Sequence, residues 1–278
     1  MTLDEIIAEA LKEDLGDGDH SSLATIPKNA KGKAQLLVKE NGIIAGINLA
    51  KKIFKTIDST LIFKKFLDDG AKVKIGDIAF EIEGSSISIL SAERLVLNFM
   101  QRMSGIATKT AELVSSLKGL NVKLLDTRKT TPLLREIEKY AVKIGGGENH
   151  RFGLYDVIMI KDNHIDFSGG IQKAILATQS YLKSINRNLK IEIEVRNLKE
   201  LNEVLNCGGV DRIMLDNFSI AKMRKAVELV AGKCETEASG GITETSIRSY
   251  AETGVDYISV GALTHHIKSL DLSLKAKK

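Results

Sequence analysis

The sequence predicts an α/β protein in which a small N-terminal α+β sandwich domain is followed by a parallel α/β barrel. In residues 1–110, short β-forming runs are separated by glycine and Asp/Asn turns, which is typical of a small antiparallel sheet. From about residue 120, strand-like and helix-like segments alternate, as in a parallel sheet with helical crossovers. Unusual polar residues recur where these later strands end, at the position of barrel active sites. We therefore expect one domain over residues 1–112 and a second over residues 113–278.

The first part begins with an amphipathic helix over Thr2–Asp14, for which Thr2 is the N-cap candidate. A second helix is expected at Asn48–Ile57, and a third begins near Ser91. The strands expected in the small, largely antiparallel sheet are Ala34–Val38, Ile43–Ala45, Leu61–Phe66, Ile78–Ile82 and Ile87–Leu90.

The second part alternates strands with helices such as Leu198–Asn206, Ala221–Val230 and Glu244–Thr253. No GxGxxG motif follows its first strand, which argues against a dinucleotide-binding open sheet. A barrel is favoured because it brings the polar strand ends together on one rim. The expected strands are Val122–Leu125, Val157–Ile160, Ile191–Val195, Arg212–Leu215, Thr236–Ala238 and Tyr257–Val260.

Composition narrows the class of ligand. The net charge of +4 is modest, and the chain has no Trp, so a nucleic-acid surface with stacked bases is not indicated. No apolar stretch has the length of a membrane helix, and the acidic N-terminus differs from a signal or transit peptide. Cys207 and Cys234 are far apart, outside any metal-ligand spacing, and are expected to be reduced, buried thiols. A cytoplasmic protein is the expectation, and the Lys-rich C-terminus (KAKK) is expected to be a solvated tail.

Cationic residues follow two of the expected strands directly. Arg128 and Lys129 come after the first, Lys161 comes after the second, and a three-glycine turn between them carries His150 and Arg151. Arg offers a planar fork for carboxylate or phosphate and Lys a mobile point charge, so a multiply anionic small molecule is expected. The alternative for His150 is a purely structural role.

Two glycine loops lie on the last two strand ends, Ser239–Gly240–Gly241 and Ser259–Val260–Gly261–Ala262. Glycine lets backbone N–H groups approach a phosphate, and a helix following each loop would add its dipole. These loops are therefore phosphate-site candidates, although tight strand-to-helix turns would need the same glycines.

Two acids, Glu194 and Asp216, end otherwise apolar strands. Their carboxylates are suited to Mg²⁺, to ribose hydroxyls or to acid–base work, and structural ion pairs with the nearby cations are the alternative. Glu192 shares the side-chain parity of Glu194, which is preferred because it lies nearer the strand's end. Arg102 lies in an apolar helix without an evident local partner. Either a salt bridge or donation into a neighbouring subunit's site would explain it.

Taken together, the motifs resemble those of the quinolinate phosphoribosyltransferase family, the decarboxylating nicotinate-nucleotide pyrophosphorylases of NAD synthesis. Departures are few: Leu133 stands where the family usually has Gly, His266 where Ser is common, and DHSS replaces a more usual Asp-x-Thr near Asp19. The resemblance runs nearly end to end through LKEDLGDGD, ERLVLNFMQRMSGIAT, DTRKTTP, EKYAVKIGGGENHRFGL, IKDNH, EIEV, MLDNF, EASGGI and ISVGALTH.

The resemblance implies an N-terminal sandwich domain and an incomplete, seven-stranded α/β barrel. It also implies a homodimer, with a hexamer as the larger alternative, in which Arg102 reaches the partner's site. The implied reaction joins quinolinate to 5-phosphoribosyl-1-pyrophosphate with Mg²⁺ and yields nicotinate mononucleotide, pyrophosphate and CO2.

The resemblance also assigns roles to residues of this chain. Lys129 and Lys161 would hold pyrophosphate, while Glu194 and Asp216 would engage the ribose hydroxyls and, directly or indirectly, Mg²⁺. These four are the catalytic candidates. Ser239 to Gly241 and Ser259 to Gly261 would cradle the 5′-phosphate. The residues expected to bind the dicarboxylate are Arg102, Arg128, His150, Arg151 and Lys161, with Thr127 beside them.

Two other functions fit parts of the pattern. A related phosphoribosyltransferase for another acidic heterocycle would keep the phosphate loops but leave part of the cationic set without a carboxylate. A catalytically silent metabolite-binding barrel would not need Glu194 and Asp216 beside a leaving group. Nucleic-acid binding is the weakest of the alternatives.

Overall fold

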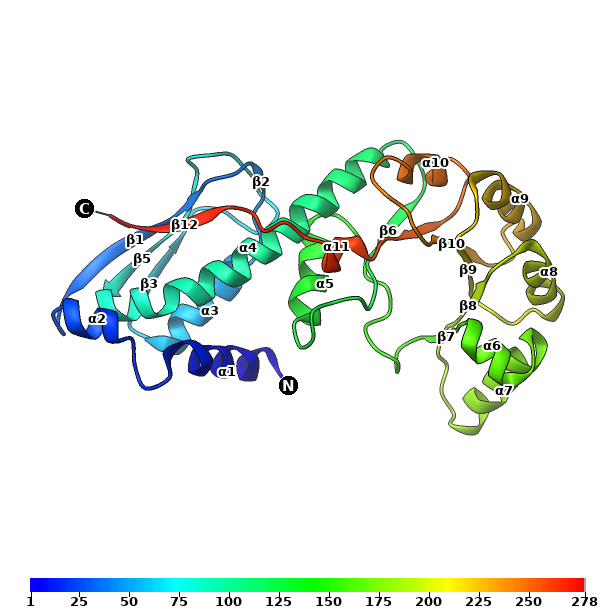
Figure 1. Ribbon diagram of the computed structural model, residues 1–278, viewed down its shortest axis with the longest axis horizontal. Coiled ribbons are helices and arrows are strands. Elements are labelled where there is room, and N and C mark those ends of the chain that lie inside the picture. The colour runs from blue at the N-terminus through cyan, green and yellow to red at the C-terminus, as the bar shows by residue number, and fades with distance from the viewer. Residues whose placement is uncertain (278) are drawn as a thin grey trace. The chain divides into compact units, whose positions relative to one another are not determined.

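The computed structural model describes residues 1–277 (Figure 1). The chain forms two compact units, and in each of them segments distant in sequence come together. The predicted boundary after residue 112 falls inside α4 (Ser86–Ser116). The first unit contains Met1–Ala111, Thr130–Gly146 and Leu263–Lys278, and the second contains Glu112–Lys129 and Gly147–Ala262.

The first unit is built on a four-stranded antiparallel sheet. Its strands, in spatial order, are β12 (Leu272–Lys277), β1 (Lys31–Val38), β5 (Ile78–Ser85) and β3 (Ile62–Lys65). A separate two-stranded pair joins β2 (Gly42–Ile43) to β4 (Lys72–Val73). The short runs predicted at Ala34–Val38, Leu61–Phe66 and Ile78–Ile82 are thus confirmed as strands, with boundaries shifted at their ends.

Alternation of apolar side chains directs one face of this sheet inward. Ala34, Leu36 and Val38 of β1 are buried at every second position, as the period of a strand requires. Figure 1 shows α3 (Ile47–Ile57) and α4 running along one side of the sheet. Phe54 of α3 meets the ring of Phe80 edge-on at 6.0 Å between centroids, a favoured arrangement for buried aromatic rings.

The helices of the first unit begin where the sequence places their caps. Thr2 caps α1 (Leu3–Leu15) in a reciprocal capping box with Glu5, as its predicted N-cap role requires. The helix predicted at Asn48–Ile57 is α3, which starts one residue earlier. The two remaining helices of this unit are α2 (His20–Thr25) and α5 (Arg135–Ile144).

Two expectations for the first unit are wrong. Ile87–Leu90, predicted as a strand, is the first turn of α4, because a short apolar run does not distinguish the two states and the helical spacing continues beyond it. The Lys-rich C-terminus, predicted as a solvated tail, is part of β12 up to Lys277 and pairs with β1. Its last side chains are exposed, so composition did not reveal the pairing, and Lys278 lies outside the described residues.

The second unit contains a six-stranded parallel sheet, and all six predicted strands of this part are confirmed. The sheet ends at β6 and β7, so the described residues do not close a ring, and they form six strands where seven were expected. An isolated parallel bridge joins Leu125 of β6 to Glu148. In spatial order the strands are β6 (Lys123–Leu125), β11 (Tyr257–Ser259), β10 (Glu235–Ser239), β9 (Arg212–Asp216), β8 (Ile191–Val195) and β7 (Ile158–Ile160).

Helices connect the parallel strands and bury one face each. Leu201 and Val204 are buried on α8, and Met223 and Ala226 on α9. The helices of this unit are α6 (Asp162–Ser168), α7 (Ile171–Ser184), α8 (Leu198–Cys207), α9 (Ile220–Val230) and α10 (Ile247–Ala251). The single turn α11 (Ala262–His265) follows β11, and all but its first residue belong to the first unit. Among the described residues, no helix combines the length and apolarity that crossing a membrane requires. Cys207 and Cys234 are free thiols, as expected, but only half-buried.

Candidate active site

The predicted site residues of the second unit lie at the C-terminal ends of the parallel strands. Register aligns Ser239 with Asp216, and Ser259 with Leu125, so these strand ends are neighbours in space. Because parallel strands end on the same edge of their sheet, side chains from distant parts of the sequence gather there. Thr127, Arg128 and Lys129 follow β6, Lys161 follows β7, Glu194 lies in β8, and Asp216 ends β9. Ser239 ends β10 and is followed by Gly240 and Gly241, and Ser259 ends β11 and is followed by Val260 and Gly261.

Lys161 and Glu194 form an ion pair across two adjacent strand ends. Lys161 Nζ lies 3.2 Å from Glu194 Oε2. The lysine is part-exposed while the carboxylate is nearly buried, so the pair presents its positive end to solvent. Lys161 is also the N-cap residue of α6, and its backbone N–H donates to His164 Nδ1 at 2.9 Å. The helix therefore holds the backbone of Lys161, while its side chain pairs with Glu194.

Asp216 and the first glycine loop are packed together through Asn217. Asn217 Nδ2 donates to Asp216 Oδ2 at 2.6 Å, and its backbone N–H donates to the Ser239 carbonyl at 2.9 Å. A Cβ on Gly240 would lie 2.3 Å from Asn217 Oδ1, so only glycine allows this approach. Gly241 has φ +61° with nothing within 4 Å of its missing Cβ, which leaves its backbone open on that side.

Helix dipoles contribute less to these loops than the sequence suggested. No helix starts directly after Gly241, since α10 begins only at Ile247. The segment after Gly261 is α11, which is a single turn. If these loops hold a phosphate, exposed backbone N–H groups have to provide the contacts.

Arg128 and Arg151 lie close enough to repel each other. Burial lowers the pKa of Arg151, and the positive charge of Arg128 lowers it further. The Arg151 guanidinium donates to the Val157 carbonyl at 3.3 Å, which holds it near the start of β7. Two partly buried guanidinium groups that repel each other are stabilised by an anion placed between them.

The segment that carries His150 and Arg151 is anchored to β6 by backbone hydrogen bonds. Glu148 N–H donates to the Leu124 carbonyl at 2.8 Å, and Asp126 N–H donates to the Glu148 carbonyl at 3.2 Å. The backbone N–H of His150 donates to buried Asp126 Oδ1 at 2.9 Å. These bonds hold Glu148 to His150 beside the end of β6, which leads into the turn of Thr127 to Lys129, in which Lys129 N–H donates to Thr127 Oγ1 at 3.0 Å.

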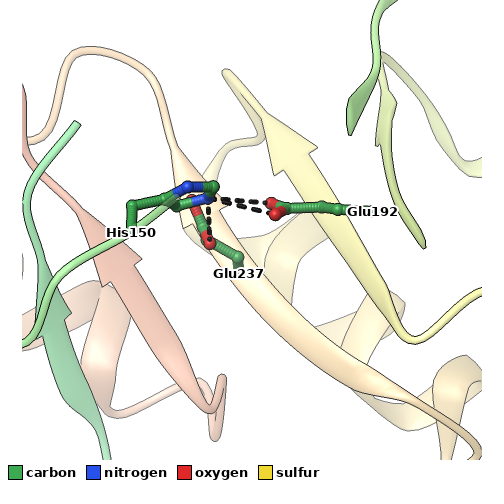
Figure 2. Close-up of side chains that lie close together, drawn as sticks. All are labelled: His150, Glu192 and Glu237. Atoms are coloured by element: carbon green, nitrogen blue, oxygen red, sulfur yellow. Dashed lines mark hydrogen bonds and ion pairs between the residues drawn. The ribbon is translucent and has the colours of Figure 1, made fainter. Parts of the chain in front are cut away.

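His150 points inward to two buried carboxylates (Figure 2). Its Nε2 lies 3.0 Å from Glu192 Oε2 and 3.3 Å from Glu237 Oε2, and the three side chains are at most 6% exposed. Burial lowers the pKa of His150, but hydrogen bonds to both carboxylates outweigh this and raise it to about 9. Burial also raises the pKa of Glu192. At neutral pH His150 is therefore protonated, and the cluster holds one proton more than it would with a neutral imidazole.

The same cluster is the group of His, Cys, Asp or Glu side chains within residues 1–277 whose ligand atoms, all within 4.8 Å, could share a metal ion. Two observations argue against that use. Nε2 of His150, the atom that would bind the metal, already faces both carboxylates, and the raised pKa keeps the ring protonated at neutral pH. Arg212 NH1 already neutralises Glu237 Oε2 at 3.0 Å.

Arg102 has its partners within its own unit. It bonds to Glu138 Oε1 at 2.7 Å, to Thr131 Oγ1 at 2.8 Å and to the Thr264 carbonyl at 3.0 Å. Glu138 is 0% exposed, whereas the Arg102 side chain is 29% exposed and lines a groove of about 760 Å³ between α1, α4 and Pro132 to Leu134. The salt bridge inferred as one alternative is thus present.

Sequence reasoning missed Glu138, Asp126, Arg212 and Glu237, and it considered Glu192 only as the lesser choice. A signal was available for some of them. Glu192 and Glu194 on β8, like Glu235 and Glu237 on β10, are acids two residues apart, which places both on one face of a strand that is otherwise buried. Such pairs predict charged side chains inside the sheet, but not which cation meets them.

Family comparison agrees with this geometry. The family model described as quinolinate phosphoribosyl transferase, C-terminal domain, matches residues 106–275, and the corresponding N-terminal domain model matches residues 19–104. A curated relative, quinolinate phosphoribosyltransferase [decarboxylating] 2b of Nicotiana tabacum, is 45% identical over 98% of this chain and 82% of its own length. The probable nicotinate-nucleotide pyrophosphorylase [carboxylating] of Bacillus subtilis is 41% identical over 99% and 93%.

Solved structures agree as well. The crystal structure of NadC from Streptococcus pyogenes superposes with a TM-score of 0.93 at 41% identity, covering 99% of this chain and 97% of that one. Human nicotinic acid phosphoribosyltransferase, at 12% identity and a TM-score of 0.67, shares the fold alone. With both domain models and whole-length relatives in agreement, this chain belongs to the quinolinate phosphoribosyltransferase family.

Proposed function

We propose that this protein transfers the phosphoribosyl group of 5-phosphoribosyl-1-pyrophosphate to quinolinate and releases pyrophosphate and CO2, forming nicotinate mononucleotide for NAD synthesis. Family membership supports this reaction, because the curated relatives are named for it. The observation that carries it in this chain is the pair Arg128 and Arg151, whose mutual repulsion an anionic ligand would relieve. A dicarboxylate supplies such charge in a planar form that matches guanidinium geometry.

The remaining groups suit the second substrate. Lys161, with its positive end toward solvent, and Lys129 would hold the pyrophosphate, while the open backbone beside Gly241 would take the 5′-phosphate. Glu194 and Asp216 lie on adjacent strands, where they would accept hydrogen bonds from the ribose hydroxyls. Ser239 and Ser259 end the two strands that lead into the phosphate loops.

Mg²⁺ is proposed as a companion of the diphosphate and not as a resident ion. Glu194 already pairs with Lys161, and Asp216 already accepts from Asn217. Two such carboxylates suit Mg²⁺, which usually keeps several waters and is bound through one or two carboxylates together with substrate phosphates. The ion would add positive charge at the departing pyrophosphate.

The chemistry divides into two steps. The pyridine nitrogen forms a bond to the ribose C1 while the C1–O bond to pyrophosphate breaks, and the leaving group takes the bonding electrons. The bond from C2 to its carboxylate then breaks, CO2 departs, and the adjacent cationic ring nitrogen stabilises the electron pair left on C2 until a proton from water neutralises it. Glu194 would stabilise the positive charge that develops on the ribose, as preorganised electrostatics.

The proposed assembly is a homodimer in which Arg102 serves the partner's site, with a hexamer as the larger alternative. The groove beside Arg102 supports this, because the side chain remains part-exposed there although Glu138 binds its inner edge. A cytoplasmic location stays a prediction, since plant relatives are named as mitochondrial or chloroplastic.

The reaction is tested by incubating the protein with quinolinate, 5-phosphoribosyl-1-pyrophosphate and Mg²⁺, and by following CO2 and nicotinate mononucleotide, with nicotinic acid as the parallel substrate. Product from quinolinate alone supports the proposal. Product from nicotinic acid instead would keep the phosphate site but refute the dicarboxylate site. Binding without turnover of either substrate would favour a silent metabolite-binding protein.

The shared site is tested by mixing two inactive variants, Arg102→Ala and Lys161→Ala, under conditions of subunit exchange. If Arg102 acts in the partner's site, each hybrid dimer contains one site with both residues intact, and about a quarter of wild-type activity returns at full exchange. If Arg102 acts within its own chain, no hybrid site is complete and the mixture stays inactive.

A further inference from the structure

The interior of the parallel sheet carries charged side chains where barrels usually carry branched apolar ones. Glu192, Arg212 and Glu237 come from the three neighbouring strands β8, β9 and β10. His150 meets the two carboxylates from the loop that follows the bridge to β6 (Figure 2). Arg212 NH1 lies 3.0 Å from Glu237 Oε2, and the guanidinium carbon of Arg212 lies 3.8 Å from the centre of the Tyr257 ring. Typical barrel interiors are layers of Val, Ile and Leu, so this group calls for a reason.

Stability is a poor reason for it. Removing two carboxylates and a guanidinium from water costs several kcal/mol per ion, and a buried ion group is often replaceable by apolar side chains without loss. Hydrogen-bonded ions fix the orientation of the side chains that they contact, because each hydrogen bond has a direction and a length. Apolar packing does not provide this orientation.

The bonds converge on residues 150–151. Glu192 and Glu237 hold Nε2 of His150, and Nδ1 of the same ring lies 2.7 Å from the backbone nitrogen of Arg151. The backbone N–H of His150 donates to the carboxylate of Asp126, the residue before the Thr127 to Lys129 turn. The imidazole of His150 thus contacts the buried carboxylates through Nε2 and the backbone nitrogen of Arg151 through Nδ1.

We propose that Glu192, Glu237 and Arg212 are positioning residues that act through His150 to hold the Arg151 guanidinium in the orientation that receives a substrate carboxylate. This deepens the proposed function and rests on it. Arg212 takes part by fixing Glu237, to which it donates from NH1, while its other nitrogens hold Glu235 at 3.0 Å. His150 itself has both ring nitrogens directed to protein groups, so its contribution is made through Arg151.

The test is steady-state kinetics of Glu237→Gln, with each substrate varied at saturation of the other. Glutamine keeps the volume and an acceptor oxygen but removes the charge that orders His150 and Arg212. We expect KM for quinolinate to rise by about tenfold to a hundredfold, the cost of a misplaced binding group, with KM for 5-phosphoribosyl-1-pyrophosphate changed by less than about threefold. Wild-type turnover of quinolinate, measured first, separates failure of the proposed function from failure of this inference.

Glu235→Gln is the matched control. Glu235 lies on the same strand and binds the same Arg212, but it makes no contact with His150 among the described hydrogen bonds and ion pairs. Its substitution is expected to leave both KM values within about twofold of wild type, as expected for a change away from the positioned group. An equal rise of KM for quinolinate in Glu235→Gln would overturn the proposed route through His150.

A double-mutant cycle tests whether Arg151 is the group that is positioned. Introduced into an Arg151→Ala background, Glu237→Gln should raise KM for quinolinate no further, because the group it positions is already absent. Additive effects, or a lowered melting temperature with both KM values unchanged, would show a merely structural role and overturn the proposal. Glu192→Gln provides the same readouts if Glu237→Gln does not fold.

Discussion

Replacing Arg102 with Ala is expected to destabilise the protein because it leaves Glu138 as an uncompensated buried carboxylate. Glu138 is 0% exposed, and Arg102 approaches it at 2.7 Å. Breaking a buried ion pair by removing one partner costs about 3 to 5 kcal/mol. We expect a loss near the lower end, about 3 kcal/mol, because the Thr131 N–H still donates to Glu138 at 3.2 Å.

For a chain of this length, about 3 kcal/mol corresponds to a melting temperature lower by about 6 to 12 °C. Thermal unfolding followed by circular dichroism measures the shift, and urea unfolding gives the free energy independently. The control is the double variant Arg102→Ala/Glu138→Gln, which removes the orphaned charge and should recover about half of the loss. A melting temperature for Arg102→Ala within about 2 °C of wild type would refute the reasoning.

The double variant also separates stability from catalysis. If Arg102 serves only to balance Glu138, the recovered stability should bring turnover back at a temperature where all variants are folded. If Arg102 also binds quinolinate in the partner's site, KM for quinolinate should stay raised by more than about tenfold, as for the loss of one charged donor. Both results are informative because the melting curve and the kinetics are read on the same samples.

Three further outcomes are expected. Lys161→Ala and Arg128→Ala should each lower kcat/KM by more than about tenfold in the quinolinate assay, since each removes a charged donor, and wild-type turnover in either would contradict the site. Gly240→Ala should lower the melting temperature and raise KM for 5-phosphoribosyl-1-pyrophosphate, because its Cβ would lie 2.3 Å from Asn217 Oδ1; unchanged values of both would contradict the close approach. The pKa of His150 is raised from 6.5 to about 9, so its stabilisation is complete below about pH 6.5 and is lost as pH rises through about 9. Urea unfolding from pH 6.5 to 9.5 should show this decline in wild type and a flatter profile in His150→Gln, and equal slopes in the two would contradict it.

Local pattern was sufficient for the parallel part of the fold. Its six strands are short runs, most of them largely apolar, and each is separated from the next by a segment with helical spacing. The ends of parallel strands share one edge for geometric reasons, so Lys161, Glu194 and Asp216 were predicted as site residues without knowledge of their contacts.

The structure shows that Leu133, one of the departures from the family pattern, has a backbone conformation that favours glycine. The family resemblance places Gly there, and Leu133 adopts φ +67°, a left-handed conformation that costs a non-glycine residue about 1 to 2 kcal/mol. Two hydrogen bonds of Thr131 hold this turn: its N–H donates to Glu138, and its carbonyl accepts the Leu134 N–H.

Long-range pairing was beyond local pattern. The apolar run Ile87–Leu90 reads equally well as strand or helix, and it became helical because it continues into α4. The Lys-rich end became β12 because β1 offered it a free edge, where Lys277 pairs with Lys33 in register. The side chain of Lys277 also donates to Glu81 of β5, 196 residues away in the chain.

The amino-acid sequence alone defined the class of the fold, the strand ends that carry the site and the anionic character of the ligand, because helical and strand periodicity and strand-end charges are local properties. Folding in three dimensions selected which carboxylate meets which cation: Glu194 with Lys161, Glu138 with Arg102, and Glu192 and Glu237 with His150. Those choices depend on strand register and burial, which arise only when residues far apart in the chain are packed against one another.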